Sequence, residues 1–254
     1  FIPCTVILAL LVMANVFTYT LPTSKLKLKE DQNITLFKPV PNGAFDMSKV
    51  GFANEILPIN DIKVNLKMKR ILASFTYQNL KTNRLHRKAA EWFPVIEPIL
   101  AAYGIPNDFK YVPLVESGLR SGTSAKGAAG FWQFMPATAK RYGLKINGRI
   151  DERNNLQKST VAACKYIKKL YGVFNNWTLV AAAYNVGDGH MKRQISKQSQ
   201  ANYFKMKLNK ETSGYVYKLI SMKEILENPA RNGYKNQTAF VAYQVRNNTV
   251  TITE

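Results

Sequence analysis

Acidic residues are scarce in this chain. Only 16 Asp and Glu residues stand against 36 Lys and Arg among 254 residues, which gives a formal net charge of +20 at pH 7. A field of this sign attracts polyanions, and nucleic acid, anionic lipid and acidic cell-wall polymers are the candidates. The sequence has no RNA-binding aromatic strand, no zinc spacing and no helix-turn-helix pattern, so no nucleic-acid partner is expected.

Cysteine and histidine are too few for a disulfide framework or a metal centre. Cys4 lies in an apolar run, whereas Cys164 falls inside a predicted helix, where a buried thiol is typical. His86 and His190 have no metal-ligand spacing with Cys, Asp or Glu, and we interpret both as surface or capping residues. The glycines of residues 118–130 are not followed by the Gly-Lys-Ser/Thr of a phosphate loop. No cofactor is implied.

The amino-terminal residues carry an apolar segment. Residues 1–20 have no charge and contain the run Val-Ile-Leu-Ala-Leu-Leu-Val-Met-Ala. This pattern is typical of an export signal or of a single membrane anchor. We expect the natural beginning to lie further upstream, because neither Met nor a basic region precedes the run. Residues 21–61 show no sustained period and are predicted to form a linker or irregular arm.

An all-α domain is predicted for residues 62–234, because apolar residues recur there at helical spacing. Helices are expected near residues 62–75, 84–103, 106–119, 138–142, 156–170, 177–184 and 212–227. Gly187 and Gly189 are expected to end the helix before them. Residues 235–254 form a short tail with strand-like alternation and no assigned role.

Glu116 is the first candidate for chemistry. It closes the apolar segment Tyr111-Val-Pro-Leu-Val and precedes Ser117-Gly118. Apolar surroundings raise the pKa of a carboxyl group, so that the group keeps a proton near neutral pH. Such a group can act as the general acid for a glycosidic oxygen. A lone glutamate at a helix end is more often solvated, so the hypothesis depends on the neighbouring motifs.

Four ordered blocks provide that context. They are Glu116-Ser-Gly, Gly127-Ala-Ala-Gly-Phe-Trp-Gln-Phe-Met-Pro-Ala-Thr-Ala, Ala183-Tyr-Asn-Val-Gly and Glu211-Thr-Ser-Gly-Tyr-Val. With these blocks, residues 62–234 resemble the family 1 lytic transglycosylases, the soluble-lytic-transglycosylase-like domain. The resemblance implies a mainly helical, lysozyme-like fold with a substrate cleft. We also expect a monomer that needs no cofactor.

The resemblance also implies a reaction at the MurNAc-GlcNAc β-1,4 bond of peptidoglycan. Glu116 would protonate the leaving oxygen and then take the proton of the muramic acid O6 hydroxyl, which closes a 1,6-anhydro ring without water. A single general acid/base suffices because the acetamido group of the substrate assists. Asp151 and Glu152 are the candidates for a second carboxylate, but a polar cap and an ion pair explain them at least as well.

Further site residues follow from the same resemblance. By this resemblance Ser117 orients Glu116, and Gln133 and Met135 line the cleft. Tyr184 and Asn185 bind sugars, and Tyr215 approaches Glu116. The simpler alternatives are a helix-terminal cap for Ser117, a helix stop for Asn185 and core packing for Met135 and Phe131. Core packing is our prediction for Trp132 and Phe134.

The expected partners are the glycan strands of peptidoglycan, and the membrane if residues 1–20 are not cleaved. The expected location is the cell envelope, either in the periplasm or anchored to the membrane and facing it. Two other functions stay open. A hydrolase similar to goose-type lysozyme would need a positioned water and a further carboxylate. A non-catalytic wall-binding protein would have little need for Glu116.

Overall fold

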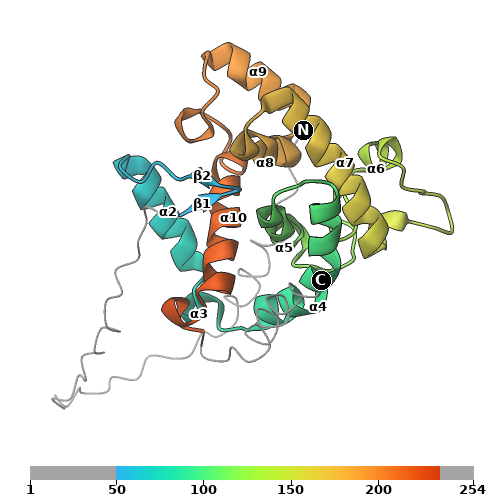
Figure 1. Ribbon diagram of the computed structural model, residues 1–254, viewed down its shortest axis with the longest axis horizontal. Helices are drawn as coiled ribbons and strands as arrows, with labels where there is room; N and C mark the ends of the chain where they lie inside the picture. The colour runs from blue at the N-terminus through green and yellow to red at the C-terminus, as the bar shows by residue number, and fades with distance from the viewer. Residues whose placement is uncertain (1–49, 235–254) are drawn as a thin grey trace, which may run out of the picture.

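A computed structural model describes residues 50–234 as a mainly helical domain, which confirms the predicted class of fold (Figure 1). The strands are β1 (Gly51–Phe52) and β2 (Glu55–Ile56), and the α-helices are α2 (Ile62–Phe75), α3 (Tyr77–Leu80), α4 (Arg84–Ala102), α5 (Tyr111–Ser117), α6 (Pro136–Arg141), α7 (Leu156–Phe174), α8 (Trp177–Val186), α9 (Asp188–Gln198) and α10 (Thr212–Glu227). Short 3-10 helices are η2 (Asn107–Lys110), η3 (Glu152–Asn154), η4 (Tyr203–Lys205) and η5 (Ala230–Asn232).

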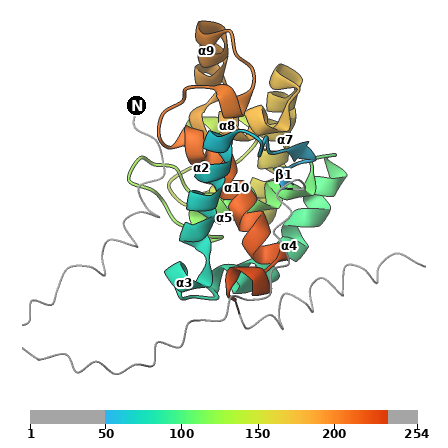
Figure 2. The same ribbon diagram turned by 90° about the vertical axis from the view of Figure 1, so that its left-hand side faces the viewer.

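Helix α10 lies at the centre of the domain. It packs against α2, α8 and α5, and the two perpendicular views show it running through the middle of the molecule (Figures 1 and 2). Twelve of its 16 residues are buried. A helix that is buried on most sides belongs to the core. This central position lets α10 carry side chains toward both α5 and α8.

A second group of helices completes the core. Helix α7 packs against both α4 and α8. In α8, Ala181, Ala182 and Ala183 are fully buried, and these small side chains let neighbouring helices approach closely. The side chain of Asn176 accepts a hydrogen bond from the Leu179 amide and so caps the beginning of α8.

The hairpin of β1 and β2 belongs to this domain, so the prediction of a linker over residues 21–61 is wrong for its last residues. Strand β1 pairs antiparallel with β2, and Phe52 and Leu57 are buried in the core. Ala53 and Asn54 both have positive φ, 52° and 64°, as in a type I′ hairpin turn. Such short strands and an Ala-Asn turn give too little periodicity to be found in the sequence.

The hairpin also caps α8. The two carboxylate oxygens of Glu55 accept hydrogen bonds from the backbone amides of Trp177 and Thr178. The first amides of a helix have no partner inside the helix, and a negative charge is favourable there. Glu55 therefore fixes the beginning of the helix whose other end reaches the candidate site.

Three of the predicted segments fall on residues that the structure does not describe. They are the apolar segment 1–20, most of the arm and the tail 235–254. Within residues 50–234, none of the helices combines the length and the apolar character that crossing a bilayer requires.

Helix α9 was not predicted. Gly187 does end α8, but with φ of 89° it turns the chain so that a new helix begins at Asp188. Asp188 forms an ion pair with Lys169 of α7, which holds the two helices together. Met191 is the buried residue of α9, so the helix lacks the apolar stripe that would have revealed it.

His86 is a buried residue, and the prediction that it lies on the surface is wrong. Its ring is packed 4.3 Å from that of Tyr234, between ring centroids. Its Nε2 lies 2.9 Å from the carbonyl oxygen of Ile225, so Nε2 carries the proton that this bond needs. The polar and basic neighbours of His86 in the sequence concealed its inward direction.

Replacing His86 by Gln should flatten the dependence of stability on pH. Burial lowers the pKa of His86 below its ordinary 6.5, and the hydrogen bond to Ile225 opposes this only in part. The unfolded chain therefore takes up the proton more readily. The stabilising contribution is complete above pH 6.5 and is lost as the pH falls toward the folded-state pKa.

Thermal unfolding at neutral and at mildly acidic pH measures this effect. On acidification the Tm of the wild type should fall further than that of His86→Gln. The variant His190→Gln controls for the loss of a histidine elsewhere and should behave as the wild type does. Equal falls in all three proteins would contradict the prediction.

Candidate active site

Glu116 lies near the end of the buried helix α5, at the edge of the core. It is the penultimate residue of α5, whose preceding residues Tyr111 to Val115 are all buried. The helix ends at Gly118, which has the left-handed conformation (φ 62°) and donates its amide to the Leu114 carbonyl. The apolar segment thus holds Glu116 at the end of α5, with part of its surface still accessible.

Tyr215 of α10 contacts the carboxyl group of Glu116. Its hydroxyl donates a hydrogen bond of 2.6 Å to Glu116 Oε1, and the Tyr215 side chain is fully buried. Burial raises the pKa of Tyr184 of α8, and the nearby charge of Glu116 raises it further; the Tyr184 hydroxyl donates to the Trp132 carbonyl at 2.9 Å. Three helices therefore meet at Glu116.

The surroundings shift the pKa of Glu116 strongly. Burial raises it from 4.5 to about 7, while the hydrogen bond from Tyr215 lowers it. Among the nearby charges, Glu211 raises the pKa and Lys218 lowers it. At a pKa near 7, protonated and ionised forms are both populated at neutral pH. One carboxyl group can then donate a proton in one step and accept one in another.

Glu211 has no predicted role from the sequence. Glu211, Tyr215 and Lys218 are four and three residues apart, so they share one face of the helix. The block Glu211-Thr-Ser-Gly-Tyr shows this spacing in the sequence, but the resemblance drew attention only to its tyrosine. The structure adds Glu211 and Lys218 as charges that act on Glu116.

Asn185 connects α8 to the beginning of α10. Its amide nitrogen donates to Glu211 Oε1 at 3.1 Å, and its amide oxygen accepts from Thr212 Oγ1 at 2.9 Å. Both polar ends of the side chain therefore have partners inside the domain. This arrangement holds Glu211 beside the site, and sugar binding by Asn185 stays a prediction.

Ser117 connects the end of α5 to the loop that follows. Its hydroxyl lies 2.9 Å from the Pro113 carbonyl and 2.8 Å from the Phe131 carbonyl. It also accepts a hydrogen bond from the Arg120 amide at 3.3 Å. The hydroxyl thus faces backbone groups and not the carboxyl of Glu116, so its effect on Glu116 acts through the position of the backbone.

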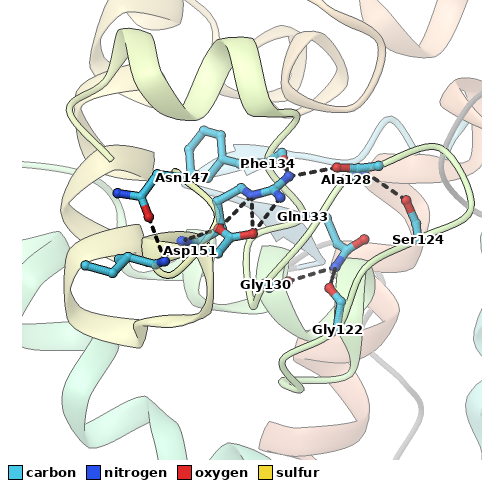
Figure 3. A network of polar contacts seen from close by, with 11 residues as sticks. Gly122, Ser124, Ala128, Gly130, Gln133, Phe134, Asn147 and Asp151 are labelled. Carbon is cyan, nitrogen blue, oxygen red and sulfur yellow. Dashed lines mark hydrogen bonds and ion pairs between the residues drawn. The ribbon is translucent and has the colours of Figure 1, made fainter. Parts of the chain in front are cut away.

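The loop between α5 and α6 carries the next predicted residues (Figure 3). Gln133 has a positive φ of 48°, and its Nε2 donates to the carbonyls of Gly130 at 2.8 Å and Gly122 at 3.3 Å. Its amide group is therefore turned into the loop. Met135 is 44% exposed and precedes α6, so it is available to line a cleft, whereas Trp132 is a core residue as predicted.

The side chain of Arg153 holds the loop between α5 and α6 in place. Its guanidinium donates to both carboxylate oxygens of Asp151, and its third nitrogen donates to the carbonyls of Gly127 at 2.7 Å and Phe134 at 3.0 Å. Asp151 is thereby engaged, and hydrogen bonding to Arg153 lowers its pKa. Glu152 pairs with Lys158 of α7. Both carboxylates therefore have the structural roles that the sequence left open.

The backbone of the loop passes against the backbone of Arg153 at Gly130. A Cβ at Gly130 would lie 1.8 Å from the Arg153 carbonyl oxygen, and φ is 77°. Gly127 has a similar φ of 83°, but a Cβ there would meet no atom within 4 Å. These two glycines separate the cost of a positive φ from the cost of a steric clash.

Gly130→Ala should destabilise the protein far more than Gly127→Ala. We expect a loss of about 1–2 kcal/mol for Gly127→Ala, the cost of a left-handed conformation for a residue with a Cβ. For Gly130→Ala we expect about 3 kcal/mol or more, because backbone atoms must also move. Urea unfolding of both variants measures the two losses. Equal losses would show that the loop is free to move away from Arg153.

Comparisons with known proteins concern the domain that carries this site. Residues 95–207 match the Transglycosylase SLT domain family. This part of the chain is therefore similar to the transglycosylase SLT domain, and the predicted resemblance to the family 1 lytic transglycosylases is confirmed.

Individual relatives of known name are similar to part of this chain. Over 140 residues the chain is 34% identical to membrane-bound lytic murein transglycosylase D of Escherichia coli (strain K12). The aligned region covers 53% of this chain and 31% of that protein. It is 32% identical over 130 residues to a protein named for tributyltin chloride resistance in Alteromonas sp. (strain M-1), covering 49% of this chain and 63% of that protein. The chain thus spans under a third of the first relative.

A solved structure of the lytic transglycosylase Slt from Pseudomonas aeruginosa, determined as an inactive mutant, is also similar. The TM-score is 0.46 at 17% sequence identity, with 68% of this chain and 29% of that chain covered.

Glu116→Gln should stabilise the protein, increasingly so as the pH rises. The folded-state pKa of Glu116, about 7, lies above the ordinary 4.5, so its contribution to stability is complete below pH 4.5 and is lost as the pH rises through 7. The neutral amide does not suffer this loss. We expect a gain on the order of 1–3 kcal/mol above pH 7 and little gain near pH 4.5.

Urea unfolding at both pH values measures the difference. Glu91→Gln is the matched control, since Glu91 lies on the surface and pairs with Lys88. A gain in the control, or a gain for Glu116→Gln that does not change with pH, would contradict the prediction.

Proposed function

We propose that this protein is a lytic transglycosylase that cleaves the MurNAc-GlcNAc β-1,4 bond of peptidoglycan without water and leaves 1,6-anhydromuramyl products. Glu116 would be the single general acid/base. The observation that carries the proposal is the partly buried contact of Glu116 with Tyr215, at which the pKa of the Glu116 carboxyl group is about 7. The SLT-domain match and the relative named as a murein transglycosylase support it.

In the first step, protonated Glu116 donates its proton to the glycosidic oxygen. The bond between this oxygen and the anomeric carbon breaks, and its electron pair stays on the oxygen. Glu116 is left as a carboxylate. The hydroxyl of Tyr215 stabilises this charge by its hydrogen bond, and the positive charge of Lys218 favours the same form.

In the second step, the Glu116 carboxylate takes the proton of the muramic acid O6 hydroxyl. The O6 atom then forms a bond to the anomeric carbon, which closes the 1,6-anhydro ring and returns Glu116 to its protonated form. The attacking hydroxyl belongs to the substrate itself, so little entropy is lost in bringing it to the reaction centre. No external water is consumed.

The described carboxylates favour a mechanism with one acidic residue. Asp151 pairs with Arg153, and Glu152 pairs with Lys158. Neither is therefore available as the nucleophile that a retaining glycosidase with two carboxylates needs. The acetamido group of the substrate would stabilise the anomeric carbon in its place.

One observation favours a second candidate function. The charge of Glu211 acts on Glu116, and a carboxylate so placed is what a lysozyme-like hydrolase needs to activate a water. In the structure Glu211 accepts a hydrogen bond from Asn185, which restricts it. We therefore favour the transglycosylase, and Glu211 provides the test that separates the two.

Several further features belong to this proposal. The partner would be glycan strands, with Met135, Gln133, Tyr184 and Asn185 along the path of the sugars. The protein would act as a monomer in the cell envelope, in the periplasm or anchored to the membrane facing it, through the segment of residues 1–20.

Incubation of the protein with purified peptidoglycan, followed by mass spectrometry of the released fragments, tests the function. We expect fragments that are one water lighter than hydrolytic muropeptides. Glu116→Gln should reduce their release by about 100-fold to 10,000-fold, the usual contribution of a general acid/base. Glu211→Gln should still give anhydro products.

Fragments of full hydrolytic mass that disappear in Glu211→Gln would replace the transglycosylase by the hydrolase. Binding to peptidoglycan without any fragments, in wild type and variants alike, would leave a wall-binding protein.

A further inference from the structure

A strongly basic segment lies between two parts of the candidate site. Residues 189–210, here called the basic arm, comprise most of α9, the following loop and η4. The arm contains no Asp or Glu and six cations, and all six are exposed: Lys192, Arg193, Lys197, Lys205, Lys207 and Lys210. Among the residues that the structure describes, none of these six forms an ion pair with a carboxylate.

Both ends of the basic arm are attached at the site. It begins four residues after Asn185 and ends immediately before Glu211, and the side chains of Asn185 and Glu211 are hydrogen-bonded to each other at 3.1 Å. Glu211 in turn is close enough to Glu116 for its charge to act there. Both ends of the basic arm therefore lie near the candidate site, and the residues between them extend away from it.

The basic arm is an ordered structure and not a loose loop. Met191 and Tyr203 are buried beneath it, and the Tyr203 hydroxyl donates to the Thr212 carbonyl at 2.7 Å. Gln198 at the end of α9 exchanges two hydrogen bonds with the backbone of Lys207. The two halves of the arm are thereby held together, and Figures 1 and 2 show α9 standing out beyond α8.

This arrangement has an electrostatic consequence. Six exposed cations that form no ion pair with a described carboxylate create a positive field around the basic arm, and such a field attracts a flexible polyanion. Their side chains are long and mobile, so they suit a partner without fixed geometry. The position at the site indicates that this partner is part of the bound substrate.

We propose that the basic arm binds the anionic peptides that are attached to the muramic acid residues of a glycan strand held at Glu116. This inference rests on the proposed function, because it takes peptidoglycan as the substrate. The free carboxylates of those peptides provide the negative charge.

The dimensions are compatible with this assignment. Helix α9 has 11 residues and is therefore about 16 Å long. An extended peptide of about four or five residues spans roughly 13–18 Å. A peptide that starts at a sugar near Asn185 can therefore reach the cations along the length of α9.

The test compares two substrates and two variants. The substrates are intact peptidoglycan and glycan strands freed of their peptides by an amidase. The arm variant is Lys192→Gln/Arg193→Gln/Lys197→Gln. The matched control is Lys63→Gln/Lys69→Gln/Arg70→Gln on α2, which removes two lysines and one arginine from another exposed helix surface.

On intact peptidoglycan at low salt, the arm variant should need about tenfold more substrate for half-maximal release, with little change in the maximal rate. On peptide-free strands it should behave as the wild type does. The control should behave as the wild type does on both substrates, and added salt should reduce the difference between wild type and arm variant.

Four results would overturn the assignment. Equal losses on both substrates would place the arm on the sugars, and equal losses in the control would indicate a general effect of net charge. No loss at all would leave the arm without a role in substrate binding. Loss of binding to vesicles rich in anionic lipid, with unchanged binding to peptidoglycan, would assign the arm to the membrane and also overturn the proposal.

Failure of the proposed function gives a different pattern. In that case the wild type releases nothing from either substrate. Sedimentation of Glu116→Gln with intact and with peptide-free material, with and without the arm substitutions, then decides the inference alone. Preferential binding to the peptide-bearing form that depends on the arm supports it, and equal binding to both forms overturns it.

Discussion

The hydrogen bond between Tyr215 and Glu116 connects the central helix α10 to the candidate catalytic residue. Moving a carboxyl group away from water is unfavourable unless the group stays neutral or gains partners. The core tolerates Glu116 because α10 is packed on several sides by α2, α8 and α5, independently of the site. The same packing gives Tyr215 one position, so the environment that shifts the acid is built before any substrate arrives.

The helical core could largely be predicted from the sequence, because apolar periodicity records which face of a helix is buried. The bounds of α2 and α10 follow the predicted ones closely. Helix α9 was missed because a polar helix on the surface leaves no such record, and because Gly187 both ends one helix and turns the chain into the next. The hairpin was missed because strands of two residues have no measurable period.

The candidate site was predictable in part. The order of the four blocks led to Glu116 and Tyr215, and the structure brings these two together across 99 residues of sequence. The polar groups of Ser117, Gln133 and Asn185 could not be assigned in the same way. A hydroxyl or an amide can bond to a backbone, a neighbour or a sugar with equal chemistry, and only the three-dimensional position decides. All three have partners within the domain.

Because Glu55 caps α8, the folded domain begins at the hairpin of β1 and β2 and not at the first helix that the sequence predicts. A shortened protein that starts at the first predicted helix, Ile62, would lose Glu55 and the buried ring of Phe52 together. Helix α8 would then begin with uncapped amides, although its far end carries Tyr184 and Asn185. Fragments intended for crystallisation or for activity measurements should therefore start before Val50, so that the hairpin remains attached.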